Sequence, residues 1–202
     1  KNDSYYHIHL PFFGEWNVSQ GHDGNITHKG EWKDAFDFVI TDENSKTFQL
    51  PGEKIEDFYC YNVPVLATAD GIVVNILDGI DDNSIGGINL NDNWGNSIVI
   101  KHADFLYSKL THLKEETFKV KIGDYVKKGD LLATCGNSGR SPEPHIHFQM
   151  QSTPYVGAKT LKYPLAYYIS KLNGKYSFHS FDYPLENQTI FKVAPNALLS
   201  KA

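Results

Sequence analysis

Residues 136–151 have the sequence GNSGRSPEPHIHFQMQ, in which a tight polar loop leads directly into an alternating segment. The loop contains Gly136 and Gly139, and residues this small let the backbone approach a site closely. From position 145 onward polar and apolar residues alternate strictly, as in a β-strand. The segment therefore predicts a strand with two distinct faces. His145, His147, Gln149 and Gln151 share one face, and Ile146, Phe148 and Met150 share the other.

The rest of the chain is also typical of a mostly β protein, because its apolar segments are short and separated by glycines. Ser97–Lys101 is one such segment, rich in β-branched residues. Within Val120–Ala133, the pairs Gly123-Asp124 and Gly129-Asp130 indicate tight reversals between short strands. We therefore expect a small antiparallel β fold, resembling a sandwich or barrel-sandwich, with a groove and one or two short helices.

Two local expectations can be stated by residue. Val63–Ala69 and Ile72–Leu77 flank Asp70-Gly71, a dipeptide that favours a hairpin turn. Pro164–Leu172 fits a helix, with proline in its first turn, an apolar stripe, and Gly174 as a stop.

The chain of 202 residues is the size of one domain. We expect residues 1–202 to form a single domain with a core of about 14–170. Residues 41–62 and 78–94 are expected to be loops or insertions, and the second is acidic. Residues 175–202 are expected to be an extension that packs around the core.

Composition excludes several classes of function. A hydrophobic content of 41% excludes an intrinsically disordered chain. The net charge is −5 and no Lys/Arg block occurs, which argues against a nucleic acid or an anionic membrane as partner. No apolar run approaches the ~18 residues of a membrane span.

Met150 is the only methionine, so we expect a segment upstream of Lys1 to have been removed. Cys60 and Cys135 can either pair or remain free thiols.

Two groups of residues are candidates for metal chemistry. His145 and His147 lie two apart on a strand, which suits one metal ligand and one group facing the substrate; a solvated strand face is the alternative. Asp37 stands in an apolar segment, where a carboxylate is costly unless it is paired or bound to metal. His28 is grouped with Asp37 as its candidate partner, and His22 and Asp34 are lower-ranked competitors for the same roles. The alternative for Asp37 is a hydrogen bond to a backbone turn.

His112, in Leu110-Thr111-His112-Leu113, is a third candidate, and its alternation places it on the same face as Leu110. A structural role is expected for the remaining histidines, His7, His9, His102 and His179. The sequence lacks His-Glu-x-x-His, Gly-x-Ser-x-Gly and the phosphate-binding loop with Lys-Ser/Thr, which argues against the helix-borne zinc site, the nucleophile elbow and the nucleotide-binding loop.

Together these motifs resemble the lysostaphin/LytM-type zinc endopeptidases. The resemblance covers roughly residues 14–170 and keeps its elements in order. They are Pro64–Ala67 with Asp70–Val73, Gly95–His102, Leu110–Leu113, Val120–Leu132, and Gly136–Ser141 followed by Pro144–Phe148.

The resemblance implies zinc held by His28, Asp37 and His147, with a fourth position left for water. His112 and His145 would be catalytic histidines that do not bind the metal, with His145 as the general base and His112 stabilising the oxyanion, or with these roles exchanged. It also implies cleavage of peptide bonds in peptidoglycan, in the cross-bridge or the stem peptide, and a location outside the cytoplasm. The oligomeric state is not implied.

This sequence departs from the family pattern at three places. His28 and Asp37 lie nine residues apart instead of the usual four, Pro142-Glu143 replaces Thr-Gly, and Gln149 stands where Glu is common. The two insertions are expected to form walls of the groove. Two other functions compete: a non-hydrolytic zinc-binding homologue that binds cell wall or regulates another hydrolase, and a lipoyl- or biotinyl-type carrier, which the position of Met150 disfavours.

Overall fold

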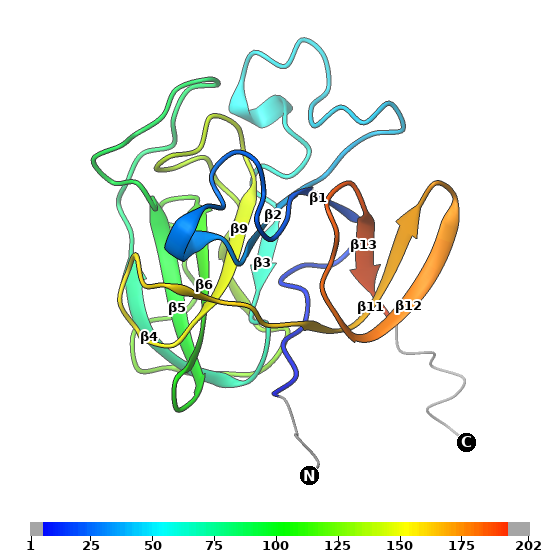
Figure 1. The fold of residues 1–202 in the computed structure, drawn as a ribbon. Helices are drawn as coiled ribbons and strands as arrows, with labels where there is room; N and C mark the ends of the chain where they lie inside the picture. Colours follow the sequence, from blue (N-terminus) through cyan, green and yellow to red (C-terminus); the bar gives the residue numbers. More distant parts are fainter. Residues whose placement is uncertain (1–5, 194–202) are drawn as a thin grey trace.

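A computed structural model describes residues 6–193, which form an antiparallel β structure (Figure 1). Within that range the only helices are two 3-10 turns, η1 (Gly30–Trp32) and η2 (Ile55–Asp57). None of these helices has the length and apolar character of a membrane span. The strands are β1 (Trp16–Gln20), β2 (Ala35–Val39), β3 (Pro64–Leu66), β4 (Gly71–Leu77), β5 (Asn96–Ala103), β6 (Leu106–Leu113), β7 (Tyr125–Val126), β8 (Leu131–Thr134), β9 (Ile146–Gln151), β10 (Thr160–Leu161), β11 (Leu165–Leu172), β12 (Lys175–Asp182) and β13 (Thr189–Lys192).

One large sheet has the order β12-β11-β13-β1-β2-β9-β6-β5-β4-β7, and β10 also pairs with β9. A second sheet contains only β3 and β8. The strand β9 lies between β2 and β6, so that His147 is opposite both Asp37 and Thr111 (Figure 1). The mostly β, antiparallel fold expected from the sequence is therefore confirmed.

The predicted alternation in β9 is confirmed, and it separates core from site. Ile146, Phe148 and Met150 belong to the hydrophobic core, where Phe148 is opposite Phe36 and Leu110. Burial of each such side chain contributes about 1.5–3 kcal/mol. The polar residues of β9 are buried as well. The face that carries His147 is therefore not the solvated surface that was the alternative.

The expected hairpin around Asp70-Gly71 is wrong. β3 pairs with β8, whereas β4 pairs with β5 and β7, so the chain passes from one sheet to the other at this turn. The Asp70 carboxylate accepts hydrogen bonds from the Lys128 backbone (2.7 Å) and the Tyr125 hydroxyl (3.2 Å). These long-range contacts, which local turn chemistry does not encode, fix the crossing.

The expected helix over Pro164–Leu172 is also wrong, because this segment is strand β11. It pairs with β12 along its length and with β13. Asn173 (φ 51°) and Gly174 (φ 75°) both adopt left-handed backbone, which makes them a tight hairpin turn and not a helix stop. Beyond position 175 the chain continues in β12 and β13, and β13 joins the large sheet through β1. The rest of the expected extension, 194–202, and the first residues, 1–5, lie outside the described range.

The hairpin geometry predicts an effect of substitution at its tip. Gly174→Ala introduces a Cβ at φ 75° and should lower the free energy of unfolding by about 1 kcal/mol in a denaturant titration. Asn173→Gly permits the same conformation and should change that free energy by less than about 0.5 kcal/mol. Equal effects of the two substitutions would argue against this turn.

Candidate active site

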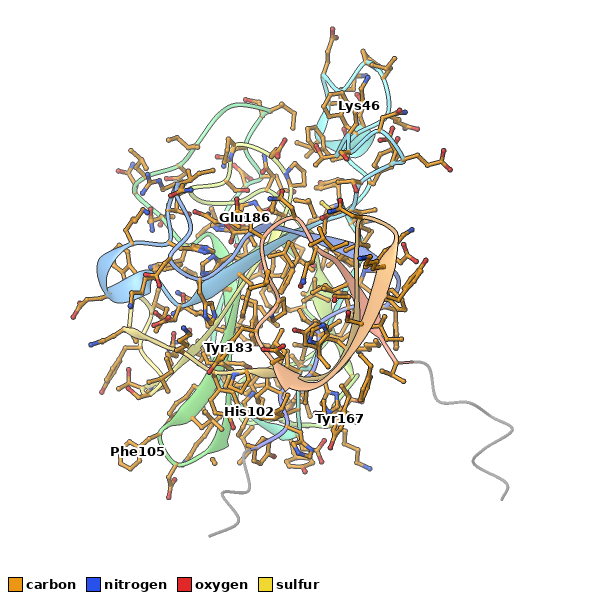
Figure 2. All side chains as sticks on the ribbon, turned by 45° about the vertical axis from the view of Figure 1, so that its right-hand side comes forward. Lys46, His102, Phe105, Tyr167, Tyr183 and Glu186 are labelled. Atoms are coloured by element: carbon orange, nitrogen blue, oxygen red, sulfur yellow. The ribbon has the colours of Figure 1, made fainter. Side chains whose placement is uncertain are left out.

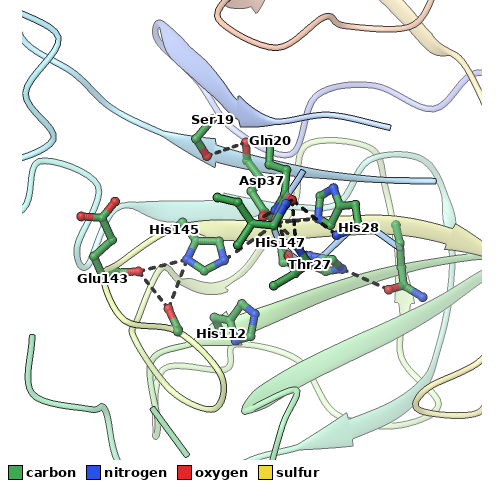
Figure 3. A network of polar contacts seen from close by, with 12 residues as sticks. Ser19, Gln20, Thr27, His28, Asp37, His112, Glu143, His145 and His147 are labelled. Carbon is green, nitrogen blue, oxygen red and sulfur yellow. Dashed lines mark hydrogen bonds and ion pairs between the residues drawn. The ribbon is translucent and has the colours of Figure 1, made fainter. Parts of the chain in front are cut away.

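The buried side chains of His28 and His147 meet that of Asp37, which faces the site from β2 (Figure 3). Its Oδ1 lies 2.8 Å from His147 Nδ1 on β9 and 3.2 Å from His28 Nε2 in the loop after β1. One ligand atom from each residue lies within 4.8 Å of the others, and the group could hold a metal ion. The segment around Asp37 is apolar because this strand also contributes Phe36 and Phe38 to the core.

Hydrogen bonds on the far side of each ring fix which nitrogen faces Asp37. His28 Nδ1 donates to the Gly21 carbonyl oxygen (2.7 Å), because a carbonyl can only accept. His147 Nε2 donates to Gln149 Oε1 (3.0 Å). Two lone pairs and a carboxylate oxygen then point at one another, an arrangement that a divalent cation between them would satisfy. The donor set therefore fits a metal.

The charges at this point support the same conclusion. Burial opposes ionisation of Asp37, but the adjacent imidazoles of His147 and His28 outweigh burial and hold the pKa of Asp37 well below its usual range. Burial lowers the pKa of His147 despite the nearby carboxylate, whereas at His28 the carboxylate outweighs burial and raises the pKa. A buried, ionised Asp37 requires a positive charge beside it. A protonated His28 or a bound cation would supply that charge.

A chain of amides holds the orientation of His147. Gln149 Nε2 donates to Gln151 Oε1 (2.8 Å), and Gln151 Nε2 donates to the carbonyl oxygens of Thr153 (2.7 Å) and Tyr155 (3.0 Å). Because both final acceptors are backbone carbonyls, each amide along the chain has a defined orientation. The polar face predicted for β9 therefore serves to present His147.

Two further histidines lie beside the cluster. His145 Nε2 is 3.9 Å from Asp37 Oδ1, and its Nδ1 donates to the Glu143 carbonyl oxygen (3.0 Å) (Figure 3). The ring of His112 lies 4.7 Å from that of His145, between centroids, and its Nδ1 donates to the Ser138 carbonyl oxygen (2.8 Å). All five predicted residues line one pocket.

The alternation predicted that His112 lies on the same face as Leu110, and this prediction is wrong. Two residues of β5, Asn96 and Ile98, are opposite Leu113 and Leu110, so β6 contains an extra residue and forms a β-bulge. His112 itself has a left-handed φ of 61°. The bulge turns its ring out of the core and into the pocket. Strain of this kind in a residue other than glycine is characteristic of functional sites.

The family assignment follows from the sequence around this pocket. Residues 55–158, about half of the chain, match the family model described as peptidase family M23. The chain belongs to peptidase family M23. The matched range includes His112, His145 and His147, whereas His28 and Asp37 lie before it.

Relatives within M23 agree with this assignment. ShyC, a peptidoglycan DD-endopeptidase of Vibrio cholerae, is 29% identical over 131 residues, which are 64% of this chain and 26% of ShyC. Lysostaphin of Staphylococcus simulans is 33% identical over 82 residues, 40% of this chain and 16% of lysostaphin. The chain thus spans about a quarter or less of the length of these curated relatives. The lysostaphin-type resemblance is confirmed.

A solved structure shows that the fold is shared. The M23 metalloprotease pseudoalterin from the deep sea matches with a TM-score of 0.51 at 16% identity, covering 90% of this chain and 100% of that one. The M23 family implies a bound metal, and the His-Asp-His group is present in this chain.

Gln20 is a functional residue that sequence reasoning missed. Its Oε1 accepts hydrogen bonds from the backbone N–H groups of Ile26 (2.9 Å), Thr27 (2.9 Å) and His28 (3.4 Å), and its Nε2 donates to Asp37 Oδ2 (2.8 Å). One buried amide therefore positions two members of the cluster. The available signal was weak: Gln20 occupies a buried position of β1 that follows the alternation of Trp16 and Val18.

Lys109 is a second missed residue. It is buried on β6 opposite Gln149, and its Nζ lies 3.4 Å from the centroid of the Trp94 ring without a hydrogen-bond partner among the described residues. Burial lowers the pKa of Lys109 to about 7. Trp94 lines the pocket, and its carbonyl accepts from the His112 backbone (3.3 Å). The contact thus holds one wall of the pocket.

The insertion 78–94 is attached to the glycine loop that precedes β9. Asn83 Nδ2 donates to the carbonyl oxygens of Asn137 (2.8 Å), Gly139 (2.7 Å) and Ser141 (3.0 Å), and the Asp82 carboxylate accepts from the Asn137 backbone (2.6 Å). This insertion also contributes Asn93 and Trp94 to the pocket wall. Within the described range, residues 41–62 contribute none of the residues that line it.

The competing residues lie elsewhere. His22 and Asp34 face each other at 3.9 Å, outside the His-Asp-His group. His102, labelled in Figure 2, contacts the Asp70 carbonyl (2.8 Å) and Ser108 Oγ (2.7 Å). His179 contacts Ser170 Oγ (2.8 Å), and His7 and His9 pack against Tyr167.

The two cysteines are buried and free in this structure. Cys60 Sγ donates to the Pro144 carbonyl oxygen (3.0 Å) beside His145.

Gln20→Ala tests the support of the site. It leaves three backbone N–H groups and a carboxylate oxygen without their partner, so affinity for Zn²⁺ should fall by about 10- to 100-fold in a competition titration. The free energy of unfolding should fall by about 2 kcal/mol. Gln49→Ala, at an exposed position, is the matched control and should change neither. Unchanged metal affinity in Gln20→Ala would contradict the role given to this amide.

Proposed function

We propose that this chain is a zinc-dependent endopeptidase that hydrolyses peptide bonds of bacterial peptidoglycan, in a cross-bridge or stem peptide. The observation that carries the proposal is the convergence of two imidazole lone pairs and one carboxylate beside two further histidines of fixed orientation. The relative ShyC is itself named a peptidoglycan DD-endopeptidase, which supports the substrate class. Since that substrate lies outside the cytoplasm, we also propose an extracytoplasmic location.

We assign the metal to His28 Nε2, Asp37 and His147 Nδ1. Two nitrogens and one carboxylate oxygen are a donor set found in catalytic zinc sites, which keep one position open. When bound there, Zn²⁺ would lower the pKa of a water molecule and polarise the scissile carbonyl. Gly21, Gln149 and Gln20 hold the ligands in place before the metal arrives.

We assign the general base to His145. Its Nδ1–H is engaged by the Glu143 carbonyl, so the unprotonated Nε2 faces the cluster. His145 takes one proton from the attacking water, whose oxygen forms the bond to the carbonyl carbon. It then delivers that proton to the nitrogen of the leaving amine as the C–N bond breaks. Imidazole suits both steps because its ordinary pKa is close to neutrality.

His112 has a more restricted role than the family resemblance implies. Because its Nδ1–H donates to Ser138, donation from Nε2 to an oxyanion would require a cationic ring. Burial, reinforced by the neighbouring His145 and His147, holds the pKa of His112 well below its ordinary value. We therefore propose that neutral His112 accepts a hydrogen bond through Nε2, from the attacking water or from a substrate N–H.

Metal removal tests the proposal against its alternative. Dialysis against a chelator should abolish the release of soluble peptides from purified sacculi, and Zn²⁺ should restore it while Mg²⁺ should not. Mass spectrometry of the released material identifies the bond that is cleaved. Zinc-loaded protein that binds sacculi but releases nothing would support the non-hydrolytic homologue instead.

Substitutions separate the two kinds of histidine. His147→Ala should lose bound zinc and hydrolysis together, as measured by elemental analysis and turnover. His145→Ala should retain zinc while kcat falls by about 10²- to 10⁴-fold, because only the base is removed. His7→Ala removes an exposed histidine and should resemble the wild type. Full turnover in His145→Ala would refute the base assignment.

A further inference from the structure

Arg140 is the only arginine in the chain, and it lies at the pocket that holds the five site residues. It is exposed and also lines an adjoining hollow, together with Ile26, Lys29 and Trp32. Its guanidinium forms no ion pair with any carboxylate of residues 6–193. Arg140 therefore brings a permanently charged fork of five donors to the place where the two hollows adjoin, and no carboxylate of residues 6–193 pairs with it.

The backbone that carries Arg140 is fixed. Its N–H donates to the Asn93 carbonyl (2.9 Å), and the carbonyls on either side, of Gly139 and Ser141, accept from Asn83. Gly139 (φ 81°) packs so closely that a Cβ there would lie 2.4 Å from the Gly95 nitrogen. The loop therefore fixes the backbone position from which the Arg140 side chain extends beside the pocket that His145 lines, and such pre-organisation favours selective binding.

The surrounding charge makes this arginine distinctive. The chain carries a net charge of −5, and the two hollows also expose Glu31 and Glu143. An anionic group is therefore disfavoured along most of this surface and favoured beside Arg140, where Lys29 adds a second positive charge. A planar carboxylate matches the guanidinium in shape and charge.

We propose that Arg140 is a specificity-determining residue that binds a carboxylate of an acidic peptide substrate while the scissile bond lies at the metal cluster. The inference rests on the proposed function and adds the chemical class of the substrate. The carboxylate is either a side-chain group or the peptide's own terminus. Its binding selects peptides with that charge over neutral ones.

The test uses three synthetic peptidoglycan peptides of one sequence: one with all carboxylates free, one with side-chain carboxylates converted to carboxamides, and one with only the terminus converted. Cleavage (kcat and KM) and affinity by calorimetry are measured on the zinc-loaded wild type and on Arg140→Gln and Arg140→Lys. Lys46→Gln, on the exposed loop seen in Figure 2, removes the same charge elsewhere and is the matched control.

We expect the wild type to prefer the free peptide over one of the two carboxamides by about 10- to 100-fold, mainly in KM and in affinity. The carboxamide peptide that the wild type binds more weakly than the free peptide identifies the source of the carboxylate. Arg140→Gln should lose the preference by weakening only the carboxylate peptide, Arg140→Lys should restore it in part, and Lys46→Gln should keep it. Equal affinities of the wild type for all three peptides would overturn the inference while leaving the proposed hydrolysis intact. Absence of cleavage with the affinity preference retained would instead refute the proposed function alone.

Discussion

The structure of the site depends on one buried carboxylate, that of Asp37. Its strand must be apolar to build the core, yet the side chain on its other face is ionised and touches two imidazoles. A charge in such a place is tolerated only with a compensating charge and complete hydrogen bonding. The neighbouring strands supply these: β9 brings His147, β1 brings Gln20, and the intervening loop brings His28.

The hydrogen bonds behind each histidine determine what the site can do. Backbone carbonyls of Gly21, Ser138 and Glu143 each hold one imidazole N–H, and Gln149 holds that of His147. The rings therefore direct their lone pairs into one pocket. A cluster of acceptors without donors is suited to a cation and to protons in transit, which is the requirement of metal-assisted hydrolysis. The same constraint is the reason that His112 is assigned as an acceptor.

Sequence reasoning succeeded where chemistry is local and failed where it depends on distant contacts. The alternation of residues 145–151 predicted β9 and its two faces because a strand has a period of two. The prediction of a hairpin at Asp70 was wrong because β3 pairs with β8 and β4 pairs with β5, and both partners lie further along the chain. The Asn173-Gly174 pair is compatible with either a helix end or a hairpin turn. The preceding segment is strand β11 because it pairs with β13, which lies further along the chain. Gln20 could not be found because a buried amide has no motif.

We propose that His28, Asp37 and His147 bind one divalent metal that keeps a position open. Anomalous diffraction at the zinc edge, on crystals grown with one equivalent of Zn²⁺, tests it directly. We expect a single peak within about 2.2 Å of His28 Nε2, an Asp37 carboxylate oxygen and His147 Nδ1. A peak elsewhere, or a fourth protein ligand closing the coordination sphere, would contradict it.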